Sequence, residues 1–380
     1  MTARPTITAR IYAVPRAGTQ FVALEGLRAY AAFLIFLVHY WDCYATRALG
    51  VDLNGLRLAT VPDVGTGVVY YLFASHYGVD LFFFLSGFLI CKIVSRSPFE
   101  YGRFVMLRFA RIYPPFVMSL AVWVYVRVGV QQWYALDAGQ LVGNLLFLNA
   151  LPGLGVTPFN TVTWSLFFEF VFYLSFPAVL ALHSRRRVTP GTIVLFAVLF
   201  MPVALLLGGF FVRFLSFFGG ALLASLPDAS IREVASRIPD GLAIALYLSS
   251  TALFAQLLSY AFFVPLFVVT TFVLVVKVAY GGGPLHRAFA WTPLRYFGNV
   301  SYSFYLVHGL AIELVMNRAM ESWLVPGGLA YLMTTFVASL TLGTALATAL
   351  FVLTERRYFT WRRSAVDRAR RTPGVAVVGG

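Results

Sequence analysis

Stretches of about 20 apolar residues recur along the whole chain, and this repetition most constrains the fold. Of the 380 residues, 60% are hydrophobic and only 12% carry a charge. A stretch of about 20 apolar residues is long enough to cross the hydrocarbon core of a bilayer as a helix. The alternating ten-residue pattern of a transmembrane β-barrel is absent from the sequence. The sequence therefore predicts an all-α, multi-pass integral membrane protein.

The charges between the apolar stretches predict the orientation of the helices. Ten transmembrane spans are expected, at about residues 21–40, 68–91, 113–130, 163–182, 191–208, 210–226, 241–258, 260–279, 297–316 and 329–353. With both termini in the cytoplasm, most of the 29 Lys and Arg residues fall on the cytoplasmic side, as the positive-inside rule requires. This asymmetry explains the net charge of +14 without a nucleic-acid partner.

The same pattern predicts one membrane domain, residues 21–355. A cytoplasmic lead of residues 1–20 precedes it, and a basic, partly disordered cytoplasmic tail of residues 356–380 follows. Residues 131–162 contain an apolar piece interrupted by Pro and Gly that is too short to span comfortably. We expect an outer or re-entrant segment there, and its conformation stays open.

The first span carries charged and titratable residues: Glu25, Arg28 and His39. Eleven residues separate Arg28 from His39, which at about 100° per residue is roughly 20° beyond three full turns. Both side chains therefore lie on one helix face, about 16 Å apart. A guanidinium in hydrocarbon costs about 2.5–3.5 kcal/mol, so Arg28 should face protein or water. The competing interpretations are an Arg28 that snorkels to the interface and a His39 that belongs to an aromatic belt.

Two carboxylates are expected at a depth comparable to that of His39: Asp80 in the second span and Glu169 in the fourth. Ionisable residues within spans are functional candidates by default. A carboxylate beside an imidazole fixes its tautomer and favours the imidazolium that forms when the base accepts a proton. The alternative is a charge-paired structural site that holds helices together.

Two further sets of residues are candidates for binding. Arg108 and Arg111 are three residues apart and share a helix face just before Pro114 and Pro115, which suits either ordinary cytoplasmic charge or a phosphate clamp. His308 follows several aromatic residues in the ninth span, where a hydrogen-bonded packing role is the simpler interpretation. The sequence contains no metal-binding signature, Walker loop or GxSxG elbow.

Five motifs together resemble the acyltransferase-3 family of integral membrane acyltransferases. They follow the family's order and spacing: LEGLRAYAAFLIFLVHY, GVDLFFFLSGFLI, RFARIYP, TVTWSLFFEFVFYL and FGNVSYSFYLVH. In the first motif a basic residue precedes a histidine by eleven positions, as Arg28 precedes His39. The fourth motif departs from the family, which usually has a second acidic residue beside the one that matches Glu169; here Phe168 and Phe170 flank it.

The resemblance implies a multi-pass enzyme of the bacterial inner membrane that moves an acyl group from cytoplasmic acyl-CoA to a hydroxyl. Acetyl-CoA is the family's usual co-substrate, and no permanently bound cofactor or metal is expected. The acceptor would be a sugar of a surface polysaccharide or of a glycosylated metabolite. The identity of the acyl group, the acceptor and the oligomeric state stay open.

The mechanism expected from the resemblance and the residues centres on His39. It would act as general base on the acceptor hydroxyl or carry the acyl group itself, and Glu169 or Asp80 would orient it. Arg28, Arg108 and Arg111 would bind the phosphates of acyl-CoA. Candidates for contacting the acceptor or the oxyanion are Trp164, Ser165, Ser301, Tyr302 and His308. The rival hypothesis is a transporter or channel whose pathway is lined by the polar face of the first span.

Overall fold

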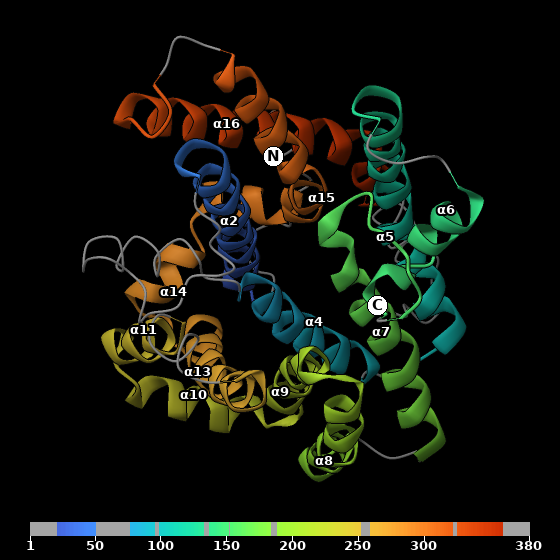
Figure 1. The fold of residues 1–380 in the computed structure, drawn as a ribbon. Coiled ribbons are helices and arrows are strands. Elements are labelled where there is room, and N and C mark those ends of the chain that lie inside the picture. The colour runs from blue at the N-terminus through green and yellow to red at the C-terminus, as the bar shows by residue number, and fades with distance from the viewer. Residues whose placement is uncertain are drawn as a thin grey trace, which may run out of the picture.

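The computed structural model describes residues 21–50, 77–95, 99–132, 137–151, 153–183, 188–251, 259–321 and 325–359, and over these residues it is all-helical, as predicted. The α-helices are α2 (Ala23–Tyr44), α4 (Gly78–Val94), α5 (Tyr101–Val124), α6 (Ala138–Leu145), α7 (Trp164–His183), α8 (Pro190–Leu207), α9 (Phe214–Ser225), α10 (Asp228–Arg237), α11 (Asp240–Ser249), α13 (Tyr260–Tyr280), α14 (Pro284–Phe289), α15 (Thr292–Met320) and α16 (Leu329–Leu353) (Figure 1). The predicted lead of residues 1–20 and most of the predicted tail lie outside the described residues.

Each of the ten predicted spans contains a helix, but not every helix has the length and composition of a span. Five described helices are long and apolar enough to cross a membrane: Ala23–Leu49, Tyr101–Val130, Pro190–Leu207, Ala261–Tyr280 and Leu329–Leu353. A sixth is reached if the helix pair Phe210–Ser225 and Asp228–Arg237, bent by 105°, counts as one span. The structure therefore fits a multi-pass protein, whereas the number ten and the orientation of the termini stay predictions.

Two segments refine the predicted boundaries. The third span is expected at about residues 113–130, but its helix begins earlier: α5 is one continuous helix that starts at Tyr101 and contains Pro114 and Pro115. Arg108 and Arg111 consequently lie on the same rigid helix as the apolar span. In the ambiguous region, α6 has only eight residues and reaches about 12 Å, too short to cross a bilayer.

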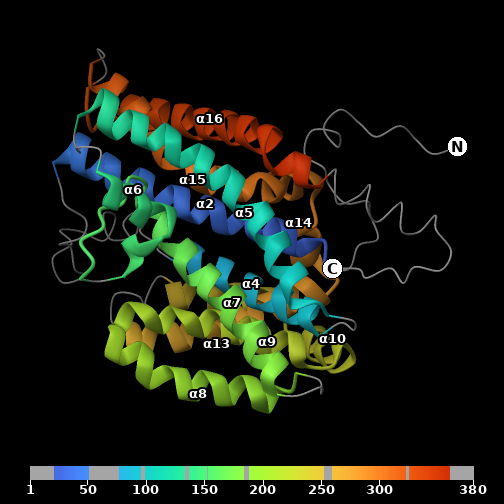
Figure 2. The same ribbon diagram turned by 90° about the vertical axis from the view of Figure 1, so that its right-hand side faces the viewer.

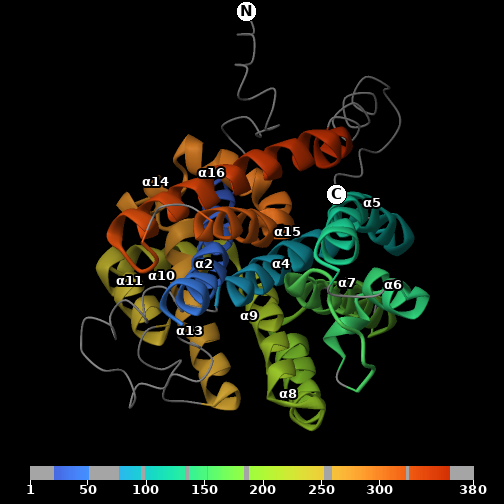
Figure 3. The ribbon, with the colours of Figure 1, turned by 45° about the horizontal axis from the view of Figure 1, so that its top comes forward.

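The helices are arranged around α2, which lies near the middle of the bundle. Helix α15 packs against α2 and α16, and α4 packs against α9. Figures 2 and 3 place α16 on the far side of α15 from α4, with α8 at the opposite edge of the bundle. Interleaved phenylalanine rings fill the contact of α4, α7 and α9, where Phe217 stacks on Phe83 and on Phe172 with ring centroids 4.5 Å apart in both pairs.

Glycine allows α2 and α15 to approach until their backbones touch. A Cβ atom at Gly298 would lie 1.9 Å from the carbonyl oxygen of Glu25, so no larger residue fits there without moving a helix. Small residues at such contacts are a general means of helix association in membranes. An ion pair between Glu25 of α2 and Arg295 of α15 connects the same two helices, with 2.8 Å from Oε2 to Nε.

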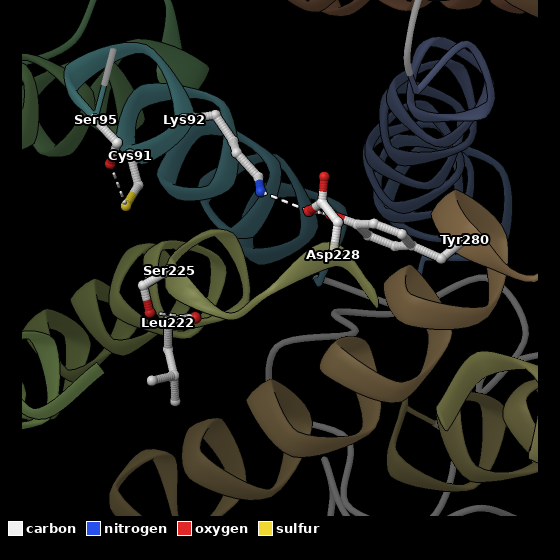
Figure 4. A network of polar contacts seen from close by, with 7 residues as sticks. All are labelled: Cys91, Lys92, Ser95, Leu222, Ser225, Asp228 and Tyr280. Carbon is white, nitrogen blue, oxygen red and sulfur yellow. Dashed lines mark hydrogen bonds and ion pairs between the residues drawn. The ribbon is translucent and has the colours of Figure 1, made fainter. Parts of the chain in front are cut away.

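A polar network connects α10 to two of the spans at one end of the bundle. Lys92 at the end of α4 and Tyr280 at the end of α13 both donate hydrogen bonds to the same oxygen of Asp228, at 2.8 and 3.0 Å (Figure 4). Asp228 is the first residue of α10, so its carboxylate connects the bend between α9 and α10 to α4 and α13.

The contact between α2 and α15 generates a stability prediction. Gly298→Ala should lower the free energy of unfolding by about 1–3 kcal/mol, because the added methyl group overpacks a backbone contact. The measurement is the Tm of the purified protein in detergent. Gly102→Ala on α5 is the control, since none of the described residues comes within 4 Å of its Cβ position. An equal Tm for both variants would contradict the close packing described above.

Candidate functional site

An elongated cavity lies between α2, α4, α5, α7 and α15. Its lining residues are Arg28, Val79, Phe82, Phe83, Leu85, Ser86, Leu89, Ile90, Arg108, Arg111, Ile112, Ser165, Leu166, Glu169, Tyr173, Tyr302 and Tyr305. Along α4 the cavity extends from Val79 to Ile90, eleven residues or about 16 Å of helix. It therefore follows most of the length of one helix rather than forming a pit at a surface.

Three arginines gather at one end of this cavity, which we call the arginine end: Arg28, Arg108 and Arg111. Aromatic rings support two of the guanidinium groups, because Arg108 lies 5.8 Å above Tyr173 and Arg111 lies 5.4 Å above Phe359. Nε of Arg28 is buried and has no hydrogen-bond partner among the described residues. These groups can therefore turn donors toward an anion, which suits the planar, forked geometry of phosphate recognition.

Two carboxylates accompany the arginines. Glu169 lines the cavity, accepts a hydrogen bond of 3.1 Å from Ser86, and lies within electrostatic range of Arg28 and Arg111. Glu355 is 1% exposed, accepts a hydrogen bond of 2.6 Å from Ser303, and also interacts with Arg28 and Arg111. Glu25 also lies within electrostatic range of Arg28, but it already pairs with Arg295. Among the described residues, two carboxylates against three guanidinium groups therefore leave a net positive charge at the arginine end.

The far end of the cavity carries hydroxyl groups. Tyr305 and Ser165 share a hydrogen bond of 2.7 Å, and both line the cavity. Tyr302, nearer the middle, donates a hydrogen bond of 2.9 Å to the carbonyl oxygen of Ile112 on α5. Phenol and alcohol hydroxyls of this kind can donate to an oxygen that gains negative charge during a reaction.

A hydrogen-bonded histidine pair lies beside the hydroxyl end. Nδ1 of His39 on α2 is 3.0 Å from Nε2 of His308 on α15. The ring of Tyr305 lies 6.0 Å from that of His308, which connects the pair to the cavity through one residue of α15. Because His39 shares a helix face with Arg28 eleven residues earlier, the pair and the arginine end stand about 16 Å apart along α2.

The expected meeting of His39, Asp80 and Glu169 is not found in the structure. Asp80 is fully buried and forms an ion pair of 2.6 Å with Arg213, which is 3% exposed. A carboxylate buried between apolar helices requires a cation, and Arg213 supplies it. Glu169 faces the arginine end instead. The partner of His39 is therefore His308, not a carboxylate.

Of the other residues predicted to contact the acceptor or the oxyanion, some line the cavity and others have structural contacts outside it. Ser165 and Tyr302 line the cavity, and their contact with a substrate stays a prediction. Trp164 packs below Arg213, whose Cζ lies 5.4 Å from its ring, and thus belongs to the ion pair of Asp80. Ser301 is fully buried and donates to the carbonyl oxygen of Gly298 on its own helix.

Glu355 is the site residue that the sequence analysis missed. It is the last residue of the predicted membrane domain, two positions beyond the last span and directly before Arg356 and Arg357, so its position gives no sign that it is buried. Its complete burial and its bond to Ser303 place it inside the bundle. Among the described residues, no group of three His, Cys, Asp or Glu side chains is arranged to hold a metal ion.

The bundle of apolar helices encloses a cavity lined by charged, hydroxyl and apolar side chains, which defines the class: an integral membrane protein built around an internal site. Residues 21–356 match the family described as "Acyltransferase domain", so the chain belongs to the acyltransferase-3 family of membrane acyltransferases.

Two curated proteins are similar to parts of the chain. Acyltransferase MdmB of Streptomyces mycarofaciens is 30% identical over 161 residues, which cover 41% of this chain and 38% of MdmB. Protein 2 in picA locus of Rhizobium radiobacter is 31% identical over 200 residues, which cover 47% of this chain and 90% of that protein. No solved structure matches the chain.

The ion pair of Asp80 generates a prediction about stability. Asp80→Leu should lower the free energy of unfolding by about 3–5 kcal/mol, because it removes the carboxylate partner of a buried guanidinium. The double variant Asp80→Leu with Arg213→Met should regain most of that loss, since both charges are then gone.

The measurement is thermal unfolding of all variants in the same detergent. Glu233→Leu is the control, because its ion pair with Arg237 is mostly exposed and should contribute little. A double variant as unstable as Asp80→Leu alone would show that the two residues do not act as a structural pair.

Proposed function

We propose that the protein transfers an acyl group from cytoplasmic acyl-CoA to a hydroxyl of a carbohydrate. One observation carries the proposal: a single cavity connects three guanidinium groups with the neighbourhood of a histidine pair. Coenzyme A has a multiply phosphorylated head and a long flexible arm that ends in the thioester. A cationic end and a reactive end separated by about 16 Å suit a donor of that shape.

The arginine end is assigned to the phosphates of acyl-CoA. Arg28, Arg108 and Arg111 provide forked donors, and guanidinium–phosphate pairs are among the strongest hydrogen bonds in proteins. In the proposed orientation this end faces the cytoplasm, where acyl-CoA is available. Glu169 and Glu355 hold the guanidinium groups in place while the site is empty, which limits the cost of burying three like charges.

The histidine end is assigned to the chemistry. His39 accepts the proton of the acceptor hydroxyl while the oxygen attacks the thioester carbonyl. The carbon–oxygen bond forms, the carbon–sulfur bond breaks, and the proton passes from His39 to the leaving thiolate. In the second form of the mechanism, Nε2 of His39 attacks the thioester carbonyl and expels the CoA thiolate. The acceptor oxygen then attacks the acyl-imidazole, the carbon–nitrogen bond to His39 breaks, and the hydroxyl proton goes to the thiolate. Ser165 and Tyr305, which line the cavity, are proposed to donate to the oxyanion.

The acceptor is proposed to be a sugar of a surface polysaccharide or glycosylated metabolite, and the acyl group acetyl. The support is membership of the acyltransferase-3 family together with the similarity to Acyltransferase MdmB. The histidine end faces the outer side of the bacterial inner membrane in this proposal.

The deciding experiment uses purified protein in lipid nanodiscs with acetyl-CoA. Release of free CoA that depends on an added sugar acceptor supports the proposal. Mass spectrometry of surface glycans and secreted metabolites from a deletion strain then identifies the acyl mass that is lost. A protein that moves a solute across liposomes but releases no CoA would be a transporter, which overturns the proposal.

The assignment of the arginine end predicts a change in donor binding. Arg111→Ala should raise the KM for acyl-CoA about 10-fold or more with a smaller change in kcat, because one charge-assisted phosphate contact is lost. Arg237→Ala is the control, since that side chain is 75% exposed and lies outside the cavity. An unchanged KM for acyl-CoA would exclude Arg111 from donor binding and leave it as an ordinary cytoplasmic positive charge.

The assignment of His39 predicts a change in turnover. His39→Gln should lower kcat by about 10²- to 10⁴-fold, the usual contribution of a general base, while the protein stays folded in the membrane. Size-exclusion chromatography and Tm establish the fold of the variant. Wild-type turnover by this variant would exclude His39 from the chemistry.

A further inference from the structure

We infer that His308 is the positioning residue of the site, a neutral imidazole that holds His39 with its reactive nitrogen unprotonated. The inference rests on the proposed function, in which His39 is the reactive group. It departs from the sequence analysis, which expected a carboxylate in this place and treated His308 as a packing residue or an acceptor contact.

The hydrogen bonds of the pair determine the tautomers. Nδ1 of His308 lies 3.1 Å from the carbonyl oxygen of Phe304, which can only accept, so this nitrogen carries a hydrogen. A neutral His308 therefore presents a lone pair at Nε2, 3.0 Å from Nδ1 of His39. Nδ1 of His39 also lies 3.0 Å from the carbonyl oxygen of Ile35. Because both neighbours accept, Nδ1 of His39 carries the hydrogen and Nε2 is left as the basic nitrogen.

His308 is held more rigidly than His39. It is fully buried, and the ring of Phe304 stacks on it with centroids 5.7 Å apart and planes 19° from parallel. Helix α16 closes against this turn at Gly343, where a Cβ atom would come within 3.2 Å of Phe304 and 3.8 Å of the Cα of His308. A side chain locked by packing can hold a mobile partner in one rotamer.

The hydrogen bonds of His308 also prevent it from passing on the proton that His39 takes up. Its Nδ1 hydrogen points to the carbonyl of Phe304 in its own helix, and its Nε2 faces His39, so no further acceptor continues the chain within the described residues. The proton that His39 takes from the hydroxyl therefore stays on Nε2 until the thiolate receives it. His308 accepts from Nδ1 throughout and stabilises the imidazolium that forms in between.

The test compares two substitutions at one position. His308→Phe keeps an aromatic ring but removes the acceptor, and it should lower kcat about 10- to 100-fold with an unchanged KM for acyl-CoA. His308→Gln brings an amide oxygen near the former position of Nε2 and should restore most of that loss. A residue with only a packing role would show the opposite order, because Phe preserves the ring and Gln does not.

The matched control is His286→Gln. His286 also bonds a backbone carbonyl through Nδ1, at 2.6 Å from the oxygen of Val278, but it lies on α14 outside the cavity. This variant should keep the wild-type kcat. Equal kcat values for wild type, His308→Phe and His308→Gln would overturn the inference while leaving the proposed acyl transfer intact.

A second measurement does not depend on turnover. The chain has five histidines, so nitrogen NMR of histidine-labelled protein in lipid can be assigned with single variants. The inference expects a correlation across an N–H···N hydrogen bond between His39 and His308, with both rings protonated at Nδ1. Absence of that correlation overturns the inference. Its presence in a protein without acyl transfer would refute the proposed function alone.

Discussion

The rule that a charge buried between apolar helices must find its partner inside the protein governs the whole structure. Water cannot satisfy polar groups at that depth, so each one either pairs or marks a site. Asp80 forms an ion pair with Arg213, and Glu25 forms one with Arg295. Among the described residues, the three arginines of the cavity have near them Glu169, Glu355 and a Glu25 that already pairs with Arg295. That imbalance separates the candidate site from the ion pairs that merely connect helices.

The close approach of α2 and α15 brings the two histidines of the pair together. Gly298 lets the two backbones touch near Arg28, and further along the same pair of helices His39 meets His308. Because both helices are long and continuous, the contact near one end aligns the residues near the other. The arginine end and the histidine pair are thus parts of one rigid arrangement, as a donor that reaches both would require.

Part of this site could be predicted from periodicity alone. The spacing of Arg28 and His39 placed them on one helix face, and Arg28, Arg108 and Arg111 were expected to act together; in the structure these three arginines line one cavity. Glu169 was expected beside His39 and lies with the arginines instead. The pairing of His39 was not predictable, because Asp80, Glu169 and His308 come from three different helices at similar expected depth. Glu355 was missed because a charged residue just beyond the end of a span is expected at the membrane surface, and only the packing of the helices shows that it is buried.

The sequence by itself determined that this chain is a helical membrane protein, where its apolar stretches lie, and which family it resembles. Those properties depend on local composition and on short motifs, which no neighbouring helix can change. Only the tertiary structure decided which charge meets which partner. Helix faces are set by the sequence, but the rotation and depth of one helix against another follow from side-chain packing across the interface. For that reason Asp80 bonds Arg213 and His39 bonds His308.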